Sequence, residues 1–243
     1  MRIARLYIDR SLKTGDEFLL QKEQTHYISS VLRLRNGDQL CLFNNENAEY
    51  LAKIVALEKK SAKLKIEEKQ LCQRESNLHT TLGIGLSRGQ HMDYAIQKAV
   101  ELGANILVPL LTEFSNVKVS EDRVENKLQH WQKIIINAAE QCGRTCLPEL
   151  LAPRAINDFI QYNKSDLKLM FNPEAKLTIS HINMQPQYVS LLLGPEGGFS
   201  QTEIELATQH DYQSVSLGPR ILRAETAVVS GLTACQNYWG DLN

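Results

Sequence analysis

The first third of the chain alternates apolar and polar residues in short stretches. This alternation predicts strands at 2–8, 38–43, 49–57 and 62–67, and an apolar stripe predicts one helix at 23–34. Turn-forming residues separate these segments at Asn36-Gly37-Asp38 and Asn44-Asn45. Several short strands with one helix are typical of a small barrel-like module. The polar stretch 69–77 is the predicted end of this module.

From residue 78 onward, predicted strands and helices alternate. Apolar runs predict strands at 78–86, 105–111, 167–171, 188–193 and 214–217. Stripes at helical spacing predict helices at 92–103, 124–142, 201–210 and 225–238. This order favours a mostly parallel sheet covered by helices. Ligands of such sheets bind at the loops that follow the strands.

Composition and charge add little to this picture. The chain has 243 residues, 43% hydrophobic and 23% charged, the mix of an ordinary globular protein that can bury a large core. Residues 1–75 carry 14 Lys or Arg and 11 Asp or Glu, a net charge of +3, whereas residues 76–243 carry 13 and 17, a net charge of −4. The basic surplus of the first module suits a solvated lysine face or a phosphate-contacting surface, and counting does not choose between them.

The cysteines and the N-terminus indicate a cytoplasmic protein without a metal. Five cysteines at irregular spacing do not suit a disulfide framework. Cys142 and Cys146 lack the further ligands that zinc needs, so we interpret them as small apolar residues on one helix face. The apolar runs fall far short of the ~18 residues of a membrane span. The basic N-terminus has no apolar stretch behind it, so we expect no secretory signal.

The first glycine-bearing segment, Gly83 to Gly89, is similar to a dinucleotide-binding loop. It misses the GxGxxG spacing by one residue, and no acidic ribose ligand follows at the expected interval. The pattern GxxxxGK[ST] of phosphate-binding loops does not occur. A nucleotide-dependent oxidoreductase therefore stays an alternative function.

A second glycine-bearing loop, Gly194 to Ser200, directly follows a predicted buried strand. Ser200 and Glu203 form a capping box, and Phe199 with Ile204 suits a hydrophobic staple. Between strand and helix, two glycines permit positive φ and close approach of a ligand to the backbone. We favour a ligand-binding loop over a tight structural turn.

A third loop, Leu217 to Ala227, again joins a strand to a helix. Ile221 and Leu222 suit the wall of a pocket, to which Gly218 gives backbone access. Arg223 and Glu225 form either an exposed ion pair, which contributes little, or the mouth of that pocket.

The two loops read LLLGPEGGFS (191–200) and LGPRILRAETA (217–227), and together they resemble the knotted SPOUT methyltransferases. More closely, the chain resembles the RsmE family, which methylates N3 of a uridine in 16S ribosomal RNA. HYISSVLRLRNGD (26–38), AIQKAVELGANILVPLLTEFS (95–115) and WQKIIINAAEQCGR (131–144) extend the resemblance over nearly the whole chain. Phe114 stands where the family has an arginine that is a possible RNA contact, and Ala224 stands where threonine is common.

The resemblance implies an α/β fold of two domains. Residues 1–72 would be a PUA-like β-barrel that binds RNA, and residues 73–243 a SPOUT α/β methyltransferase domain. Its C-terminal segment would form a trefoil knot, an exception to the rule against threaded chains. The family further implies S-adenosyl-L-methionine as cofactor, a homodimer packed through the knot region, and the small ribosomal subunit as partner.

A methyl donor of this kind is a sulfonium cation with an adenosine body, and it needs backbone polar groups and apolar walls. The loops that match the family motifs supply both, and the last helix's N-terminus offers free N–H groups to an anion. The predicted cofactor-binding residues are Leu193, Gly194, Pro195, Gly197, Gly198, Leu217, Gly218, Ile221, Leu222, Arg223, Thr226 and Ala227.

Methyl transfer is an in-line displacement that depends on alignment. Uridine N3 must also lose a proton, whose acceptor is Glu196, Glu225 or a water. Arg223 or Arg88 would stabilise the resulting anion. Glu225 is equally explained as a carboxylate that favours the helix start. Arg223, Glu196 and Glu225 are thus the candidate catalytic residues.

RNA binding is expected of arginines, whose planar fork fits phosphate and stacks on bases. Arg144 either contacts RNA or caps a helix end, and His26 and His91 are interpreted as ordinary surface or core histidines. A non-catalytic RNA-binding module remains a third functional class. The predicted RNA-binding residues are Arg2, Arg5, Arg10, Arg33, Arg35, Arg88, Lys98 and Arg144.

Overall fold

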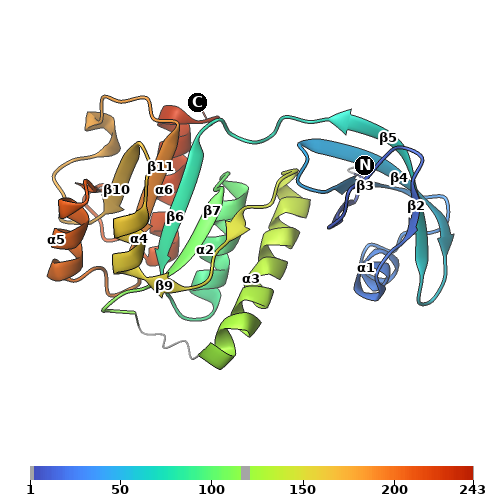
Figure 1. Cartoon of the computed structure of the whole chain (residues 1–243), viewed down its shortest axis with the longest axis horizontal. Coiled ribbons are helices and arrows are strands. Elements are labelled where there is room, and N and C mark those ends of the chain that lie inside the picture. The colour runs from blue at the N-terminus through green and yellow to red at the C-terminus, as the bar shows by residue number, and fades with distance from the viewer. Residues whose placement is uncertain (1–2, 116–120, 243) are drawn as a thin grey trace. The chain divides into compact units, whose positions relative to one another are not determined.

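The computed structural model describes residues 3–115 and 121–242, and the chain divides into two compact units (Figure 1). The first unit comprises Met1–Glu75 and Ala139–Cys146, and the second comprises Ser76–Ala138 and Leu147–Asn243. The sequence pattern does not predict the return of residues 139–146 to the first unit.

The first unit is built on a five-stranded sheet in the order β1-β3-β4-β5-β2. Only β1 and β3 run parallel, and the other neighbours are antiparallel. Four of the strands were expected, whereas the short β2 carries a single buried residue, Phe18, and gives too little alternation to be recognised. The strands are β1 (Arg5–Tyr7), β2 (Glu17–Leu19), β3 (Gln39–Phe43), β4 (Ala48–Leu57) and β5 (Ala62–Leu71).

A helical segment covers the core of this sheet. The predicted single helix consists of α1 (Lys22–His26) and a π-helical turn, η1 (Tyr27–Val31). The backbone N–H of Leu32 donates to the carbonyl of Tyr27, and Arg33 then takes a positive φ of 56°, which ends the helix. The segment buries Ile28 against the inward residues of β3, β4 and β5.

The second unit contains a sheet in the order β12-β10-β11-β6-β7-β8, and every pairing in it is parallel. The two-residue β9 also pairs with β7. The predicted parallel α/β architecture is therefore confirmed, and β10 and β11 have the predicted bounds. The strands are β6 (His79–Gly85), β7 (Ile106–Leu111), β8 (Glu149–Leu150), β9 (Arg154–Ala155), β10 (Leu167–Phe171), β11 (Tyr188–Leu193) and β12 (Gln213–Val215).

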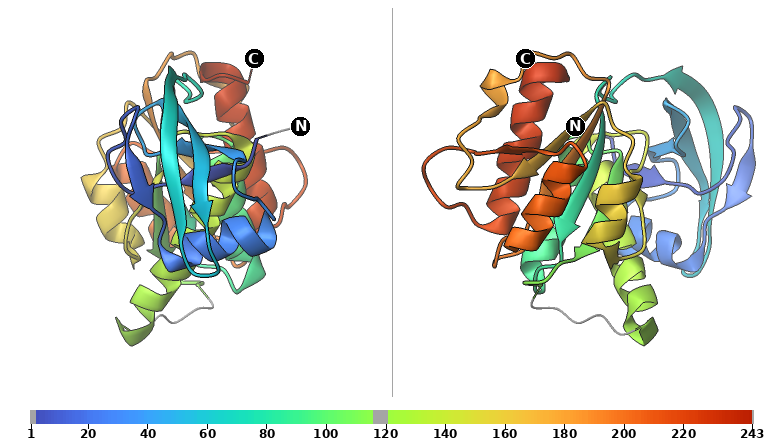
Figure 2. Two further views of the ribbon diagram at one scale, coloured as in Figure 1. Left: turned by 90° about the vertical axis from the view of Figure 1, so that its right-hand side faces the viewer. Right: turned by 60° about the vertical axis from the view of Figure 1, so that its left-hand side comes forward.

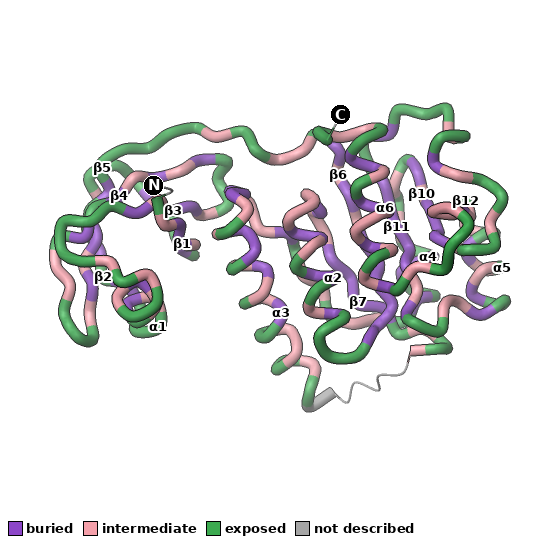
Figure 3. Tube along the Cα trace, turned by 180° about the vertical axis from the view of Figure 1, so that it is seen from behind, coloured by how far each residue is buried: buried purple, intermediate pink, exposed green. Residues whose placement is uncertain are grey.

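Helices lie on both faces of this sheet (Figure 2). The strands β6, β7, β10 and β11 are buried along most of their length (Figure 3), as is expected when both faces are covered. On one face, Leu192 packs with Phe159 and Ala207 of α4 (Ile156–Tyr162) and α5 (Gln201–Gln209). On the other, Phe171 approaches Gly231 of α6 (Ala224–Trp239), which packs against α2 (Gln90–Glu101).

The remaining elements connect these layers. α3 (Glu121–Cys142) is the long amphipathic helix expected from the sequence, and its last turn belongs to the first unit. A 3₁₀ turn, η2 (Ile179–His181), precedes β11. The short β8, β9 and α4 were not predicted, since two-residue strands and a seven-residue helix carry almost no periodicity.

Candidate functional site

A cavity of about 850 Å³ lies where β10, β11 and the segment before α6 meet. This volume is in the range of small-molecule sites, and the position is the carboxyl edge of a parallel sheet. The two glycine-bearing loops predicted to form one pocket both line it. The lining residues are His91, Phe171, Asn172, Pro173, Glu174, Gly194, Pro195, Glu196, Gly197, Gly198, Phe199, Gln201, Ile204, Ile221, Leu222, Arg223, Ala224, Glu225 and Ala227.

The loop after β11 turns sharply and presents its backbone to the cavity. The N–H of Gly198 donates to the carbonyl of Pro195 at 2.9 Å, and Gly198 has a φ of +71°. A Cβ added at Gly198 would meet no atom within 4 Å. The backbone of Gly198 therefore borders open space.

Neighbouring segments hold this loop by close packing. A Cβ on Gly85, at the end of β6, would lie 2.4 Å from the backbone nitrogen of Pro195. A Cβ on Gly197 would lie 2.8 Å from the Cβ of Phe114. Phe114, at the position where the family pattern has an arginine, thus packs against the loop. Both contacts require glycine because no side-chain atom fits between the segments.

A buried carboxylate fixes the far end of the same loop. Glu203 accepts a hydrogen bond from the backbone N–H of Ser200 at 2.8 Å, and Ser200 Oγ accepts one from the N–H of Glu203 at 3.3 Å. This confirms the predicted capping box. The other oxygen of Glu203 accepts from the backbone N–H of Glu113 at 2.8 Å, so one side chain joins the loop after β7 to the start of α5.

At the start of α6, two titratable side chains meet. His91 Nδ1 lies 3.0 Å from Glu225 Oε1. Burial opposes ionisation of Glu225, but the hydrogen bond to its own backbone N–H, the hydrogen bond with His91 and the nearby charge of Arg223 together hold its pKa below the ordinary value. Glu225 is therefore ionised near neutral pH, and it bonds to His91 rather than forming the suggested ion pair with Arg223.

Most of the predicted cofactor and catalytic residues line the cavity, and some do not. Leu193, Leu217, Gly218 and Thr226 are absent from its lining. Ile221 lies at the cavity but is 87% exposed, so it is a rim residue and not the buried wall that we expected.

Sequence reasoning missed two parts of this cavity. One is the turn Phe171–Glu174, although it follows the predicted strand 167–171, which was a usable signal. The other is His91, whose partner Glu225 is 134 residues away in the sequence.

The structure does not support a dinucleotide-binding site at the segment Gly83 to Gly89. Gly83 and Gly85 lie within β6 and not in a loop after it. A Cβ on Gly83 would lie 2.8 Å from Leu110 and 3.0 Å from Phe159. These glycines permit close packing of the sheet and its covering helix, and they leave no backbone free for a pyrophosphate.

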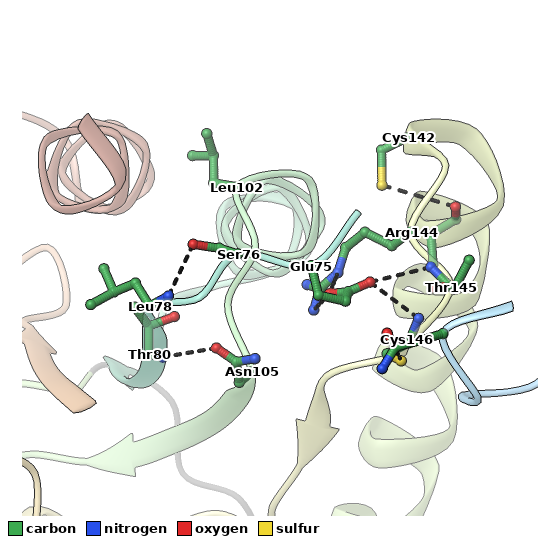
Figure 4. A network of polar contacts seen from close by, with 12 residues as sticks. Glu75, Ser76, Leu78, Thr80, Leu102, Asn105, Cys142, Arg144, Thr145 and Cys146 are labelled. Atoms are coloured by element: carbon green, nitrogen blue, oxygen red, sulfur yellow. Dashed lines mark hydrogen bonds and ion pairs between the residues drawn. The ribbon is translucent and has the colours of Figure 1, made fainter. Parts of the chain in front are cut away.

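Two predicted RNA-binding arginines are buried inside the first unit, and we correct their assignment. Arg5 is 8% exposed, pairs with Glu49 and donates to the carbonyl of Arg144 at 2.7 Å. Arg144 is 5% exposed and pairs with Glu75, which also accepts from the backbone N–H groups of Thr145 and Cys146 (Figure 4). Donors engaged in this way hold the segment after α3 in place and are not available to a phosphate.

The other predicted RNA-binding residues are placed differently. Arg10, Arg33, Arg35 and Arg88 are exposed. Lys98 is half-buried and forms an ion pair with Glu101 at 2.7 Å, so its charge is engaged within α2. Arg2 lies outside the described residues.

The cysteines form no disulfide, and Cys146 Sγ donates to Asn47 Oδ1 at 3.2 Å. Within residues 3–115 and 121–242, no three His, Cys, Asp or Glu side chains are grouped so as to hold a metal ion. The helices found in those same residues are too short or too polar to cross a bilayer.

Comparisons with known proteins agree over the whole chain. Residues 74–236 match the family described as RNA methyltransferase domain, and residues 20–67 match the RNA methyltransferase PUA domain. The ribosomal RNA small subunit methyltransferase E of Buchnera aphidicola subsp. Schizaphis graminum is 38% identical, covering 100% of this chain and 99% of that protein.

Two solved structures are also similar over their full lengths. A methyltransferase of Legionella pneumophila with bound S-adenosylmethionine is 38% identical, with a TM-score of 0.97 and 100% of both chains covered. The ribosomal RNA small subunit methyltransferase E of Neisseria gonorrhoeae, bound to S-adenosylmethionine, is 31% identical, with a TM-score of 0.94 and 100% of both chains covered.

Proposed function

This chain belongs to the RNA methyltransferase family that includes ribosomal RNA small subunit methyltransferase E, and we propose that it transfers a methyl group from S-adenosylmethionine to N3 of a uridine in 16S ribosomal RNA. One observation carries this proposal. The loop after β11 and the segment that begins α6, with α5 and β12 between them in the sequence, line one open cavity at the carboxyl edge of the sheet.

The cavity fits the proposed cofactor in shape and chemistry. Gly198 leaves open space where a side chain would stand, so a flat adenosine body has access to the backbone there. Phe171, Phe199 and Leu222 supply apolar lining. Carboxylates and one guanidinium lie around it, as suits a ligand that carries a sulfonium, an ammonium and a carboxylate. When bound, S-adenosylmethionine would supply an electrophilic methyl group.

The protein would align the uridine with the methyl group and would remove the proton from N3. Holding two reactants in line accounts for much of the acceleration of a displacement. Uridine N3 becomes a nucleophile only after it loses its proton, and the negative charge that develops needs a positive neighbour. Arg223 is exposed at the cavity and has no backbone role beyond the N-cap of α6, so we assign it to that charge. Glu196 and Glu225, the two carboxylates predicted as candidate proton acceptors, both line the cavity.

We assign RNA binding to the exposed arginines and keep residues 1–72 as the RNA-binding domain and 73–243 as the methyltransferase domain. Arg10, Arg33 and Arg35 are exposed on the first unit, and Arg88 is exposed on the second. Guanidinium groups of this kind bind phosphate and stack on unpaired bases. Their contribution to affinity should fall as salt rises.

The SPOUT trefoil knot, the homodimer and the cytoplasmic location are parts of the same proposal. The parallel order β12-β10-β11-β6 and the return of α6 against α2 support a threaded C-terminal segment. Ile221, 87% exposed, and Tyr238, exposed on α6, suit burial in a second copy of the chain. Light scattering on the purified protein should give the mass of a dimer, and the mass of a monomer would refute the proposed homodimer.

The activity is tested by methyl incorporation into small ribosomal subunits and into free 16S RNA, followed by mass analysis of the nucleosides. We expect 3-methyluridine with at least one of these substrates. Calorimetry should detect S-adenosylmethionine binding by the wild-type chain and none by Gly198→Trp, which adds a bulky side chain to the cavity lining at a φ of +71°. Saturable binding of NAD alone, or incorporation at a ribose or another base, would refute the proposal.

A further inference from the structure

His91 and Glu225 join the N-terminal turns of two helices at the rim of the cavity. His91 is the second residue of α2 and Glu225 the second residue of α6. Their side chains meet at 3.0 Å, with the histidine 47% exposed and the carboxylate 13% exposed. The carboxylate is thus enclosed, while the imidazole is half exposed and belongs to the lining of the cavity.

The hydrogen bond fixes which imidazole nitrogen holds the proton. An ionised carboxylate can only accept hydrogen bonds, so the nitrogen that faces Glu225, Nδ1, must carry the proton. In the neutral ring, Nε2 then has a free lone pair. A histidine oriented in this way by a carboxylate is the arrangement used by general bases in hydrolytic triads.

Charged groups of both signs lie around the pair. Glu225 stabilises the imidazolium that forms, and Glu174 and Glu196 of the cavity lining add negative charge. Arg223 precedes α6 and Arg88 precedes α2, and both oppose a positive ring while favouring a substrate anion. A carboxylate whose ionised form is already stabilised accepts a proton poorly, whereas imidazole exchanges protons near neutral pH.

We propose that His91 is the catalytic residue that takes the proton from N3 of the substrate uridine, and that Glu225 is its positioning residue. This inference rests on the proposed function. The N3–H bond breaks, an Nε2–H bond forms, and the electron pair stays on N3. That pair takes the methyl group from the sulfonium sulfur, which keeps the electrons of the broken C–S bond. The imidazolium then releases its proton to water.

A second histidine–carboxylate pair provides a matched control. His130 Nε2 of α3 lies 2.9 Å from Asp93 Oδ2 of α2, in a pair that is more exposed than His91 and Glu225, and neither residue lines the cavity. Asparagine suits both positions as a replacement. At residue 91 its amide N–H keeps a donor for Glu225 but provides no base.

The test compares His91→Asn, His91→Ala, Glu225→Gln and His130→Asn in single-turnover methyl transfer across pH. We expect His91→Asn to slow transfer about 100-fold or more and to bind S-adenosylmethionine as the wild type does. Its rate should keep rising with pH after the wild-type rate has levelled off, because substrate must then lose its proton to solvent. Added imidazole should restore part of the rate of His91→Ala, and Glu225→Gln should shift the pH profile.

A readout independent of turnover is the nitrogen NMR spectrum of the six histidines, in which residue 91 should show the Nδ1–H tautomer. An Nε2–H tautomer, or an unchanged rate and pH profile in His91→Asn, would overturn the role of His91 alone. A similar slowing in His130→Asn would also overturn it, because the effect would then not belong to the cavity. Absence of methyl incorporation by the wild-type chain would overturn the proposed function together with this step.

Discussion

The buried carboxylate of Glu203 is predicted to hold the cofactor loop in place. Its two oxygens accept hydrogen bonds from the backbone N–H groups of Ser200 and Glu113, both at 2.8 Å. Glu203→Ala removes both acceptors at once. We expect this substitution to destabilise the second unit and to weaken S-adenosylmethionine binding, because the loop between β11 and α5 loses its attachment.

The size of the effect follows from where the two donors lie. Ser200 is buried, so its N–H would be left without a partner, and the loss of that charge-assisted bond costs about 2 kcal/mol. Glu113 is exposed, so water replaces its partner and the cost is about 1 kcal/mol. The sum, about 3 kcal/mol, corresponds to a fall of roughly 6–12 °C in melting temperature for a unit of this size.

The assay can follow the second unit alone, since both tryptophans, Trp131 and Trp239, belong to it. Urea unfolding monitored by tryptophan fluorescence gives the change in the free energy of unfolding. Ser200→Ala, which removes only the cap oxygen, should cost about 1 kcal/mol. Glu205→Ala, on the exposed side of the same helix, should change stability by less than about 0.5 kcal/mol.

Calorimetry with S-adenosylmethionine completes the comparison. We expect affinities in the order wild type and Glu205→Ala, then Ser200→Ala, then Glu203→Ala. If Glu203→Ala unfolded at the same urea concentration as Glu205→Ala, the two hydrogen bonds would contribute nothing. Full cofactor affinity in a clearly destabilised Glu203→Ala would show that the bonds stabilise the fold without ordering the loop.

Three further predictions concern packing, pH and RNA. Gly85→Ala should lower S-adenosylmethionine affinity at least tenfold by calorimetry, because its Cβ would lie 2.4 Å from the backbone of Pro195, and unchanged affinity would mean that the loop is free to shift. Burial raises the pKa of Tyr212 to about 12 from 10.0, so the folded state holds this proton more tightly and stability falls as pH rises through that window. Tyr212→Phe should therefore show a shallower alkaline loss of stability in urea titrations, and an identical slope would contradict it. Arg35→Ala should reduce the salt dependence of RNA binding by about one ion released, whereas the control Lys60→Ala, at an exposed residue, should change this dependence less. Equal slopes of affinity against salt for the two variants would place Arg35 outside the RNA contact.

Local sequence patterns were sufficient to predict the main strands and helices of the second unit and many of the residues that line its cavity. Alternation and apolar runs gave β10 and β11 with their bounds, and the capping box at Ser200 and Glu203 gave the start of α5. These features depend on neighbours within a few residues of one another. The convergence of the two loops on one cavity followed from the parallel sheet, because the carboxyl ends of its strands share an edge.

Contacts between distant residues set the limits of that reasoning. His91 looks like an ordinary helix residue until Glu225, 134 positions away, is placed beside it. Glu75 and Arg144 are 69 positions apart, and their pairing decides that residues 139–146 belong to the first unit. No periodic pattern in the sequence predicts either of these contacts. Likewise, the glycines of β6 matched a loop pattern until their packing against Leu110 and Pro195 was known.

The buried arginines also change the meaning of the charge distribution. Residues 1–75 carry a surplus of three positive charges, which suits a phosphate-binding surface only where the cations face solvent. Arg5 is enclosed by Glu49, and Lys63 and Lys69 form ion pairs with Glu17 and Glu46. The guanidinium groups that stay exposed include those of the turn between η1 and β3, where Arg33 and Arg35 lie two residues apart. The RNA contact of the first unit should therefore be concentrated at this turn, and a double substitution of its two arginines should weaken binding more than any pair of lysines on β5.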